Sequence, residues 1–179
     1  GMLPVELMGL SPNSFKQFNN LVKNKKFLNS LITNVNSILH FINKKKFNSI
    51  IINYDENSEN LLNWYQQLVA ESLGKKQRGV LPIISNMPKD NHSVMQLYLD
   101  GFQNNFFTFF YTRDKKLMKI NNDLLIQNKR YLKNKYINEI LFAQKKGTEN
   151  VFKKKNIPFR SFEIKKRDEK TLGELFCFF

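Results

Sequence analysis

The sequence predicts an α/β domain in which helices cover both faces of a mostly parallel sheet. Short β-branched or aromatic runs alternate with longer helical patterns along the chain, and the clearest run, residues 49–54, shows no polar alternation. A strand that is buried on both faces of a parallel sheet has this continuous apolar pattern. Alternating strands and helices therefore predict a three-layer α/β/α sandwich.

The N-terminal quarter of the chain is predicted to be helical. Asn13 or Ser14 is the expected cap of a first helix. Residues 26–44 form a longer amphipathic helix, because their apolar residues recur at spacings of three and four. We expect residues 11–44 to be the leading helices of a single domain that spans residues 1–179.

Strands and helices alternate through the rest of the chain. Pro82 favours an edge position or a strand start for the second strand, because proline cannot donate to a sheet ladder. Gly74 is placed to end the preceding helix, and Thr171 is the expected cap of the final helix. In chain order the predicted elements are strand 49–54, helix 59–73, strand 79–84, helix 91–99, strand 106–112, helices 134–144 and 148–155 broken at Gly147, strand 160–164 and the final helix. Ligands of such sheets bind at the carboxyl ends of the strands, so the loops after Tyr54, Ser85 and Thr112 are candidate site edges.

Composition limits the class of protein. A hydrophobic fraction of 41% is typical of a folded soluble protein. The apolar runs are much shorter than the roughly 20 residues that cross a bilayer. No charged and then apolar leader opens the chain, and the single Cys177 suits a reducing compartment. We therefore expect a cytoplasmic protein with no membrane partner.

The net charge of +14 raises nucleic-acid binding as an alternative. The basic residues are mostly lysines scattered through the predicted helices, and the chain is also rich in Asn, Ile and Phe. This joint bias is typical of an AT-rich genome. We expect no specific nucleic-acid partner; a steep fall of affinity with salt would support the alternative.

A first candidate site lies in residues 64–75, which read W-x-x-Q-L-x-x-E-S-x-G-K. Gln67 precedes Glu71 by four residues, so both project from one helical face. The negative end of the helix dipole disfavours a charged carboxylate there, which favours Glu71 as a proton acceptor. Taken alone, both residues could equally be ordinary helix surface.

A second candidate site contains His92, which precedes Gln96 by the same spacing of four. His92 is expected in the first turn of a helix opened by Asp90 or Asn91, where the positive helix end favours the neutral ring. A neutral imidazole can accept a hydroxyl proton, and the two amides, Gln67 and Gln96, can bind sugar hydroxyls. His92 alone could also be a polar surface residue.

Metal and nucleotide motifs are absent from the sequence. One cysteine and two separated histidines, His40 and His92, form no ligand cluster. The chain contains neither G-x-x-x-x-G-K-[ST] nor G-x-G-x-x-G. We expect no cofactor and no metal.

Together the two segments resemble glucose-6-phosphate isomerase, an aldose–ketose isomerase of glycolysis. The string at residues 64–75 is the most specific part of the resemblance. Supporting matches are Leu3-Pro4, Tyr54, Asp90-x-His92-Ser93-x-x-Gln96, Gly101, Gly147-Thr148, Ile157-Pro158 and Leu172-Gly173. The resemblance implies the second of two sugar-isomerase (SIS) subdomains, so the chain is expected to be a fragment of a longer protein.

The resemblance also implies roles for the candidate residues. Glu71 matches the base that moves a proton between C1 and C2 of the sugar through a cis-enediol, His92 matches the residue that assists ring opening, and Gln67 matches a substrate-contacting amide. The implied reaction interconverts glucose 6-phosphate and fructose 6-phosphate. The complete protein is expected to be a homodimer in which this histidine is contributed across the subunit interface.

Several family features are missing from the chain. The phosphate-binding Ser/Thr cluster and the Gly-Gly-Arg segment are absent, and the segment with a catalytic lysine would lie beyond Phe179. Met87 and Lys89 replace small and hydroxyl residues, and Asn91 stands where glutamine is usual. We therefore expect the isolated chain to be inactive. The alternative is a non-catalytic sugar-phosphate-binding SIS module, which would not need Glu71 as a base.

Overall fold

The computed structural model describes residues 2–113, 118–121 and 127–179. By its internal contacts the chain divides into two compact units. One unit is Gly1–Lys45 together with Lys166–Phe179, and the other is Lys46–Lys165. Within the described residues, no helix is long and apolar enough to cross a membrane.

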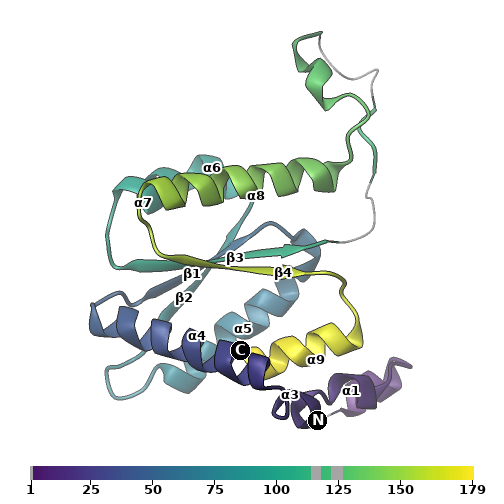
Figure 1. The fold of residues 1–179 in the computed structure, drawn as a ribbon, viewed down its shortest axis with the longest axis vertical. Coiled ribbons are helices and arrows are strands. Elements are labelled where there is room, and N and C mark those ends of the chain that lie inside the picture. Colours follow the sequence, from purple (N-terminus) through teal and green to yellow (C-terminus); the bar gives the residue numbers. More distant parts are fainter. Residues whose placement is uncertain (1, 114–117, 122–126) are drawn as a thin grey trace. The chain divides into compact units, whose positions relative to one another are not determined.

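The unit Lys46–Lys165 is built on a parallel sheet. Its strands, as far as the structure describes the chain, lie in the order β2-β1-β3-β4, and every neighbouring pair is parallel. In the register of the sheet, Ile50 lies between Ile83 and Phe107. The edge position of β2 confirms the prediction from Pro82. The strands are β1 (Asn48–Asn53), β2 (Leu81–Asn86), β3 (Asn105–Thr112) and β4 (Phe159–Ile164) (Figure 1).

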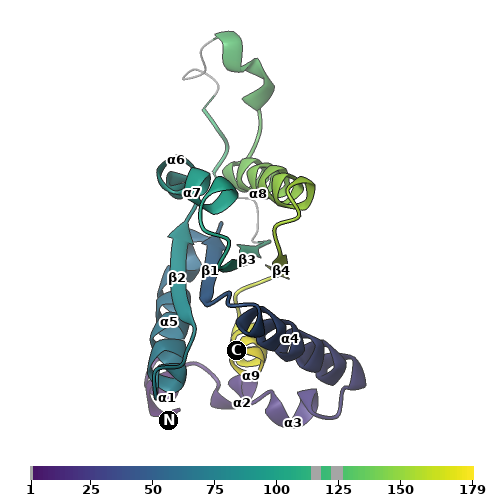
Figure 2. The ribbon, with the colours of Figure 1, turned by 90° about the vertical axis from the view of Figure 1, so that its left-hand side faces the viewer.

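Helices cover both faces of this sheet, which confirms the predicted α/β sandwich. Helix α5 (Glu59–Leu73) lies on one face, and α6 (Lys89–Ser93), α7 (Met95–Asp100) and α8 (Ile137–Lys154) lie on the other (Figures 1 and 2). The chain moves outward from β1 to β2 and then crosses back to β3 and β4. Right-handed crossovers place the helices of these two directions on opposite faces. The described residues of this unit also include the 3₁₀ segments η1 (Glu56–Ser58) and η3 (Gln127–Leu132).

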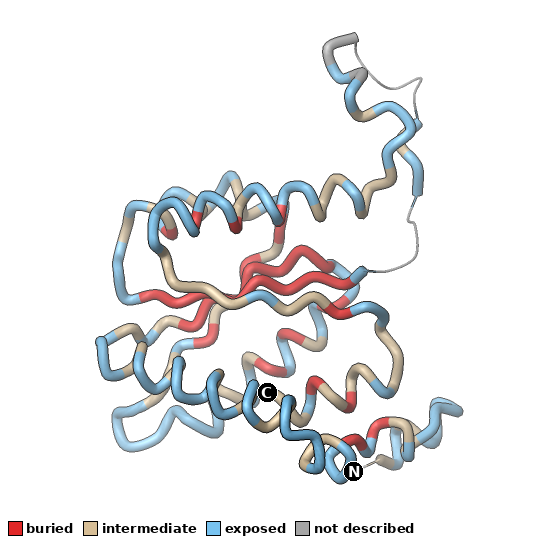
Figure 3. The backbone as a smooth tube through the Cα atoms, in the orientation of Figure 1, coloured by how far each residue is buried: buried red, intermediate tan, exposed pale blue. Residues whose placement is uncertain are grey.

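The centre of the sheet forms the core of this unit, and Figure 3 shows burial concentrated on the strands. Every residue of β3 is buried. On the face covered by α6, α7 and α8, the fully buried Phe152 contacts Phe107 and Phe109 edge to face, with ring centroids 4.9 and 5.2 Å apart. Such aromatic pairs add specific geometry to a large apolar contact area.

The other unit is helical over its described residues. Helix α2 packs on α9, where Gly173 lies against the backbone of Phe15 and the ring of Phe15 stacks on Phe176 at 6.3 Å. Asn24 caps α4 by accepting bonds from the N–H groups of Lys26 and Phe27. The helices of this unit are α1 (Leu3–Leu7), α2 (Pro12–Phe15), α3 (Phe18–Leu21), α4 (Lys25–Asn43) and α9 (Glu169–Phe178).

Two predicted helix caps are wrong. Helix α2, for which Asn13 or Ser14 was the expected cap, begins two or three residues earlier, with Ser11 at the cap and Pro12 at the first helical position, where its missing N–H costs nothing. The last helix is capped by Asp168 rather than Thr171, because the Asp168 carboxylate accepts the N–H of Thr171 at 2.9 Å. Hydrogen bonding from the backbone and then the side chain of Thr171 lowers the pKa of Asp168 to about 2.

Two predicted helix boundaries also need correction. The helix expected at residues 91–99 is two helices, because the chain leaves helical geometry at Val94, whose φ is −130°. Conversely, α8 runs through Gly147 without a break. A glycine lowers helix propensity by about 1 kcal/mol, which the buried contacts of α8 on either side of it outweigh.

Candidate active site

The Gln67–Glu71 pair lies on the exposed side of α5. Leu62 and Tyr65 bury the opposite side of this helix. The side-chain nitrogen Nε2 of Gln67 donates to Oε1 of Glu71 at 2.9 Å. Glu71 is in the last turn of the helix, which ends at Gly74. The amide therefore fixes one carboxylate oxygen and leaves the other available to a ligand.

Large apolar side chains flank this pair. On α5, Trp64, Leu68 and Leu73 are 42%, 39% and 53% exposed. Aromatic and aliphatic side chains at this exposure are typical of surfaces that contact another protein segment when they cluster beside a polar site.

His92 lies in α6, on the face of the sheet opposite to α5. The helix opens at Lys89 after Pro88, so His92 is the fourth of its five residues and not in the first turn as predicted. The ring is exposed. Both residues that precede it point inward: Asp90 Oδ2 accepts bonds from Ser85 Oγ at 2.9 Å and from the Asn86 N–H at 2.8 Å, and Asn91 Oδ1 is buried.

Gln96 belongs to α7 and not to the helix of His92. Its Nε2 donates to Asp100 Oδ2 at 2.8 Å, and Lys155 pairs with the other oxygen of Asp100. The hydrogen bond from Lys155 lowers the pKa of Asp100. Because helical geometry is interrupted at Val94, the spacing of four residues does not place Gln96 and His92 on one continuous helical face.

One chain does not bring Glu71 and His92 together. Helix α5 begins at the carboxyl end of β1 and leads back to the amino end of β2, so Glu71 lies at the amino edge of the sheet. His92 follows the carboxyl end of β2 and lies on the other face (Figures 1 and 2). The two are therefore separated by about the length of β2, on the order of 20 Å for six residues.

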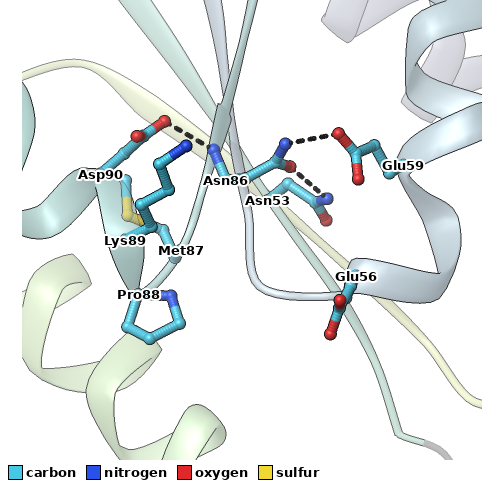
Figure 4. A pocket seen from close by; sticks show the side chains of 8 residues that line it. All are labelled: Asn53, Glu56, Glu59, Asn86, Met87, Pro88, Lys89 and Asp90. Atoms are coloured by element: carbon cyan, nitrogen blue, oxygen red, sulfur yellow. Dashed lines mark hydrogen bonds between the residues drawn. The ribbon is translucent and has the colours of Figure 1, made fainter.

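A polar cavity of about 380 Å³ opens at the carboxyl ends of β1 and β2. Asn53 Nδ2 donates to Asn86 Oδ1 at 2.9 Å, and Asn86 Nδ2 donates to Glu59 Oε1 at 2.9 Å. In Figure 4 the carboxylates of Glu59 and Asp90 lie on either side of Asn86. The loops that follow these strands are among the predicted site edges, but the sequence motifs do not identify Asn53, Asn86 or Glu59 as site residues. The position of Asn53 and Asn86 at strand ends is the signal that could have identified these two residues.

A smaller cavity of about 290 Å³ lies between the loops that follow β1 and β3 and includes Asp55, Tyr111 and Thr112. The Asp55 carboxylate accepts bonds from Ser58 and Thr112, both at 2.5 Å. This buried carboxylate joins the ends of β1 and β3. Within the described ranges, no group of three or more His, Cys, Asp or Glu side chains could hold a metal ion.

A buried ion cluster joins α8 to β4. Lys145 is fully buried, and its Nζ donates to Glu149 at 2.7 Å, Ser161 at 2.8 Å and Glu163 at 2.8 Å. Hydrogen bonds from Lys145, Lys146 and Arg113 lower the pKa of Glu163 to about 2. Each charge in this cluster has partners, so the cluster is a structural connection between the helix and the edge strand.

Sequence comparisons find several curated enzymes of one kind. The chain is 34% identical over 149 residues to a probable glucose-6-phosphate isomerase of Methanococcus maripaludis, covering 81% of this chain and 33% of that protein. It is 32% identical over 188 residues to the glucose-6-phosphate isomerase of Mycoplasmopsis pulmonis, covering 100% of this chain and 44% of that one. The chain thus spans less than half the length of these curated relatives. No family model matches the chain.

Structural comparison agrees on the fold. The crystal structure of a hypothetical protein from Thermus thermophilus matches with a TM-score of 0.82 and 20% sequence identity, covering 99% of this chain and 45% of that one. At this identity the match shows a shared fold.

Proposed function

We propose that this chain, which is related in sequence to glucose-6-phosphate isomerases over most of its length, forms one catalytic half of such an isomerase. The complete protein would interconvert glucose 6-phosphate and fructose 6-phosphate, and the chain would be its C-terminal SIS subdomain. The observation that carries the proposal is the Gln67–Glu71 pair, a carboxylate held by one amide with its second oxygen open.

In the proposed reaction Glu71 is the base. Its free carboxylate oxygen takes the proton from C2 of the open-chain aldose, the electrons of that C–H bond form the C1=C2 bond of a cis-enediol, and O1 gains a proton. Glu71 then returns its proton to C1. The carbonyl forms at C2 as O2 releases its proton, which balances the proton that O1 gained. A positioned carboxylate that transfers protons in this manner typically contributes about 10²–10⁴ in rate.

His92 is proposed to assist ring opening by exchanging a proton with the sugar hydroxyl. Since Glu71 and His92 of one chain lie at opposite edges of the sheet, the two cannot reach one sugar together. We therefore propose that each site combines Glu71 of one copy with His92 of a second copy, in a two-fold symmetric dimer. The exposed apolar residues beside Glu71 support burial of this surface in the complete protein.

The test is a coupled isomerase assay with fructose 6-phosphate on three proteins: this chain alone, the full gene product that carries it, and that product with Glu71→Gln. We expect activity in the full product and a loss of at least about 10²-fold in Glu71→Gln. Glu6→Gln, an exposed carboxylate on α1, is the control and should retain activity.

The isolated chain is expected to show little turnover, because the phosphate-binding groups expected from the family are absent and positioning supplies large rate factors. Near-normal turnover by the chain alone would contradict this expectation. A folded full product without activity would favour the non-catalytic sugar-phosphate-binding module instead. Full activity in the Glu71→Gln variant would contradict the role of Glu71 as the base.

A further inference from the structure

One exposed side of α5 has an apolar centre. Trp64 and Leu68 are four residues apart on this helix, and their side chains are 42% and 39% exposed. Residues three and four positions apart are neighbours on a helix surface. The exposed strip, which we call the α5 strip, therefore consists of Trp64, Gln67, Leu68 and Glu71. Beside it, Gln66 Nε2 donates to the carbonyl oxygen of Pro82 at 2.8 Å, which attaches α5 to β2.

The end where α5 begins is acidic. It lies at the carboxyl ends of β1 and β2, beside the polar cavity of about 380 Å³. Three carboxylates and one ammonium group line this cavity, those of Glu56, Glu59, Asp90 and Lys89. Glu56 and Glu59 are exposed, and neither forms a salt bridge with another described residue. This acidic end is therefore available to cations of another molecule.

The end where α5 stops is basic. The loop from α5 to β2 carries three exposed cations, Lys75, Lys76 and Arg78. The Arg78 N–H donates to the Lys75 carbonyl at 3.0 Å, so a tight turn holds these cations together. None of the three pairs with a carboxylate of the described residues. The 15 residues of α5 separate this basic end from the acidic end by about 20 Å, which is too far for the two to neutralise each other within one chain.

The free edge of β2 is closed to a further strand. Across the described residues β2 pairs only with β1, and the N–H groups of Leu81 and Met87 are bonded on that side. Even-numbered residues of β2 therefore direct their N–H groups to the free edge. There, Pro82 has no N–H, and the Asn86 N–H already donates to Asp90 Oδ2 at 2.8 Å. A second copy thus cannot extend the sheet as a continuous ladder, and a contact at this edge falls to the side chains of α5.

A two-fold axis through the middle of the α5 strip makes this surface complementary to itself. A two-fold interface places the same patch of both subunits against each other. With two copies of α5 antiparallel, Trp64 and Leu68 meet their own copies at the centre. The acidic end of each copy then meets the basic end of the other, so every attraction occurs twice. A parallel arrangement would place like charges together, which costs affinity.

We propose that two copies of this chain associate through the α5 strip in this antiparallel arrangement, with the basic loop at residues 75–78 of each copy against the acidic end of the other. This rests on the proposed function, which requires a second copy, and it assigns the surface through which that copy binds. Glu71 lies near the basic end of α5, whereas His92 lies in α6, beyond the carboxyl end of β2 and thus near the acidic end (Figure 2). The same two-fold axis therefore brings the end of one copy that carries Glu71 towards the end of the other that carries His92.

The test is a charge exchange in the full gene product, with the dissociation constant of the dimer measured by sedimentation equilibrium at low and at physiological salt. Reversing the acidic end (Glu56→Lys with Glu59→Lys) or the basic end (Lys75→Glu with Arg78→Glu) places like charges together twice in each dimer. We expect either reversal to raise the dissociation constant at least about tenfold, and both reversals in one chain to restore it to within about threefold of the wild type. The loss from each single reversal should shrink as salt screens the charges.

The control is Lys153→Glu with Lys154→Glu, two exposed lysines on α8. It changes the net charge by as much as the reversal of the basic end, and it should leave the dissociation constant unchanged. Trp64→Ala tests the apolar centre and covers the case in which a reversed variant does not fold. It should raise the dissociation constant at least about tenfold at both salt concentrations, because a buried tryptophan at the centre of an interface carries much of the binding energy.

Unchanged dissociation constants in the reversed variants, or a combined variant that is weaker than either reversal alone, would overturn this surface. If a refolded mixture of Glu71→Gln and His92→Ala still recovers activity in that case, the shared site stands and only the surface is wrong. A full product that stays monomeric would overturn the surface and, if it is active, the shared site as well.

Discussion

At the scale of single residues, the most informative contact is the one between Gln67 and Glu71. The amide donates to Oε1 of the carboxylate at 2.9 Å, within one exposed helical turn. This contact orients the carboxylate without burying it, and one Gln67 proton remains for a sugar hydroxyl. A base on a flexible surface side chain gains much of its efficiency from such orientation.

Replacing Gln67 by leucine should therefore reduce turnover in the full gene product. If the proposed function holds, kcat/KM should fall about 10-fold to 10²-fold, because Glu71 would lose its donor and the sugar would lose a hydrogen-bond partner. The coupled isomerase assay measures the change. Gln103→Leu, which removes an exposed loop amide bonded to the Gly101 carbonyl, should have no effect; equal losses in both variants would contradict the role of Gln67.

The lowered pKa of Glu163 predicts that the free energy of unfolding depends on pH. Its native pKa is about 2, held below the ordinary value of 4.5 first by the hydrogen bond from Lys145 and then by those from Lys146 and Arg113. Above pH 4.5 the residue is ionised in both native and unfolded chains, so its stabilisation is fully present. As the pH falls from 4.5 towards 2, only the unfolded chain takes up the proton, so this stabilisation is lost.

Chemical denaturation at several pH values between 6 and 2.5 measures the effect. The free energy of unfolding should fall across this range, and Glu163→Gln should show a shallower fall than the wild type. The comparison isolates Glu163 from other shifted carboxylates such as Asp168. Identical pH slopes in the two proteins would show that Glu163 does not contribute.

At the scale of elements, α8 is held to β4 by the buried cluster around Lys145. Lys145 and its neighbour Lys146 both pair with Glu149 and Glu163, but Lys145 is fully buried and Lys146 is 46% exposed. Removing a buried partner leaves uncompensated charges, whereas an exposed pair is screened by water. The two lysines are therefore a matched pair that separates burial from charge.

We expect Lys145→Ala to lower the free energy of unfolding by about 3–5 kcal/mol. Lys146→Ala should lower it by less than about 1 kcal/mol. Urea denaturation of both variants at neutral pH measures the difference. Similar losses in the two variants would mean that burial at Lys145 does not determine the strength of this connection.

Two helical glycines differ in the space available for an added Cβ atom. At Gly147 in α8 an added Cβ meets no atom within 4 Å, whereas at Gly173 in α9 it would lie 2.2 Å from the carbonyl oxygen of Phe15. Gly147→Ala should therefore stabilise the protein by about 0.5–1 kcal/mol through helix propensity. Gly173→Ala should destabilise it, because α2 must move away from α9 to make room. Thermal unfolding should shift upward for the first and downward for the second; the same sign in both would contradict this account.

At the scale of the whole molecule, the separation of Glu71 and His92 predicts how two inactive variants behave together. If each site takes Glu71 from one copy and His92 from another, a mixed dimer of Glu71→Gln and His92→Ala contains one intact site and one doubly altered site. Random pairing makes half of the dimers mixed, so about a quarter of wild-type activity should return in a symmetric dimer.

Co-refolding or co-expressing the two full-length variants and assaying fructose 6-phosphate measures this recovery. Each variant refolded alone is the control and should remain inactive. No recovery, despite demonstrated mixed dimers, would mean that Glu71 and His92 do not act in a shared site.

Local patterns were sufficient to predict most of the fold. Apolar runs and their periods predict β1, β3, α4 and α5. The edge position of β2 follows from Pro82. Local patterns did not predict three other features: the helix break at Val94, the continuity of α8 through Gly147 and the Asp168 cap. Each of these depends on contacts with distant residues or on competition between neighbouring caps, which local propensity does not contain.

The sequence by itself determined the parallel α/β architecture and singled out Gln67, Glu71, His92 and Gln96, because burial periodicity and a specific motif are local properties of the chain. Only the tertiary structure decided where these residues lie. Helix α5 runs back along the sheet and α6 crosses to the other face, so residues 21 positions apart in sequence lie at opposite edges. The path of the crossovers is set by packing and handedness over the whole sheet, and it is this path that leaves the proposed site to be completed by a second copy.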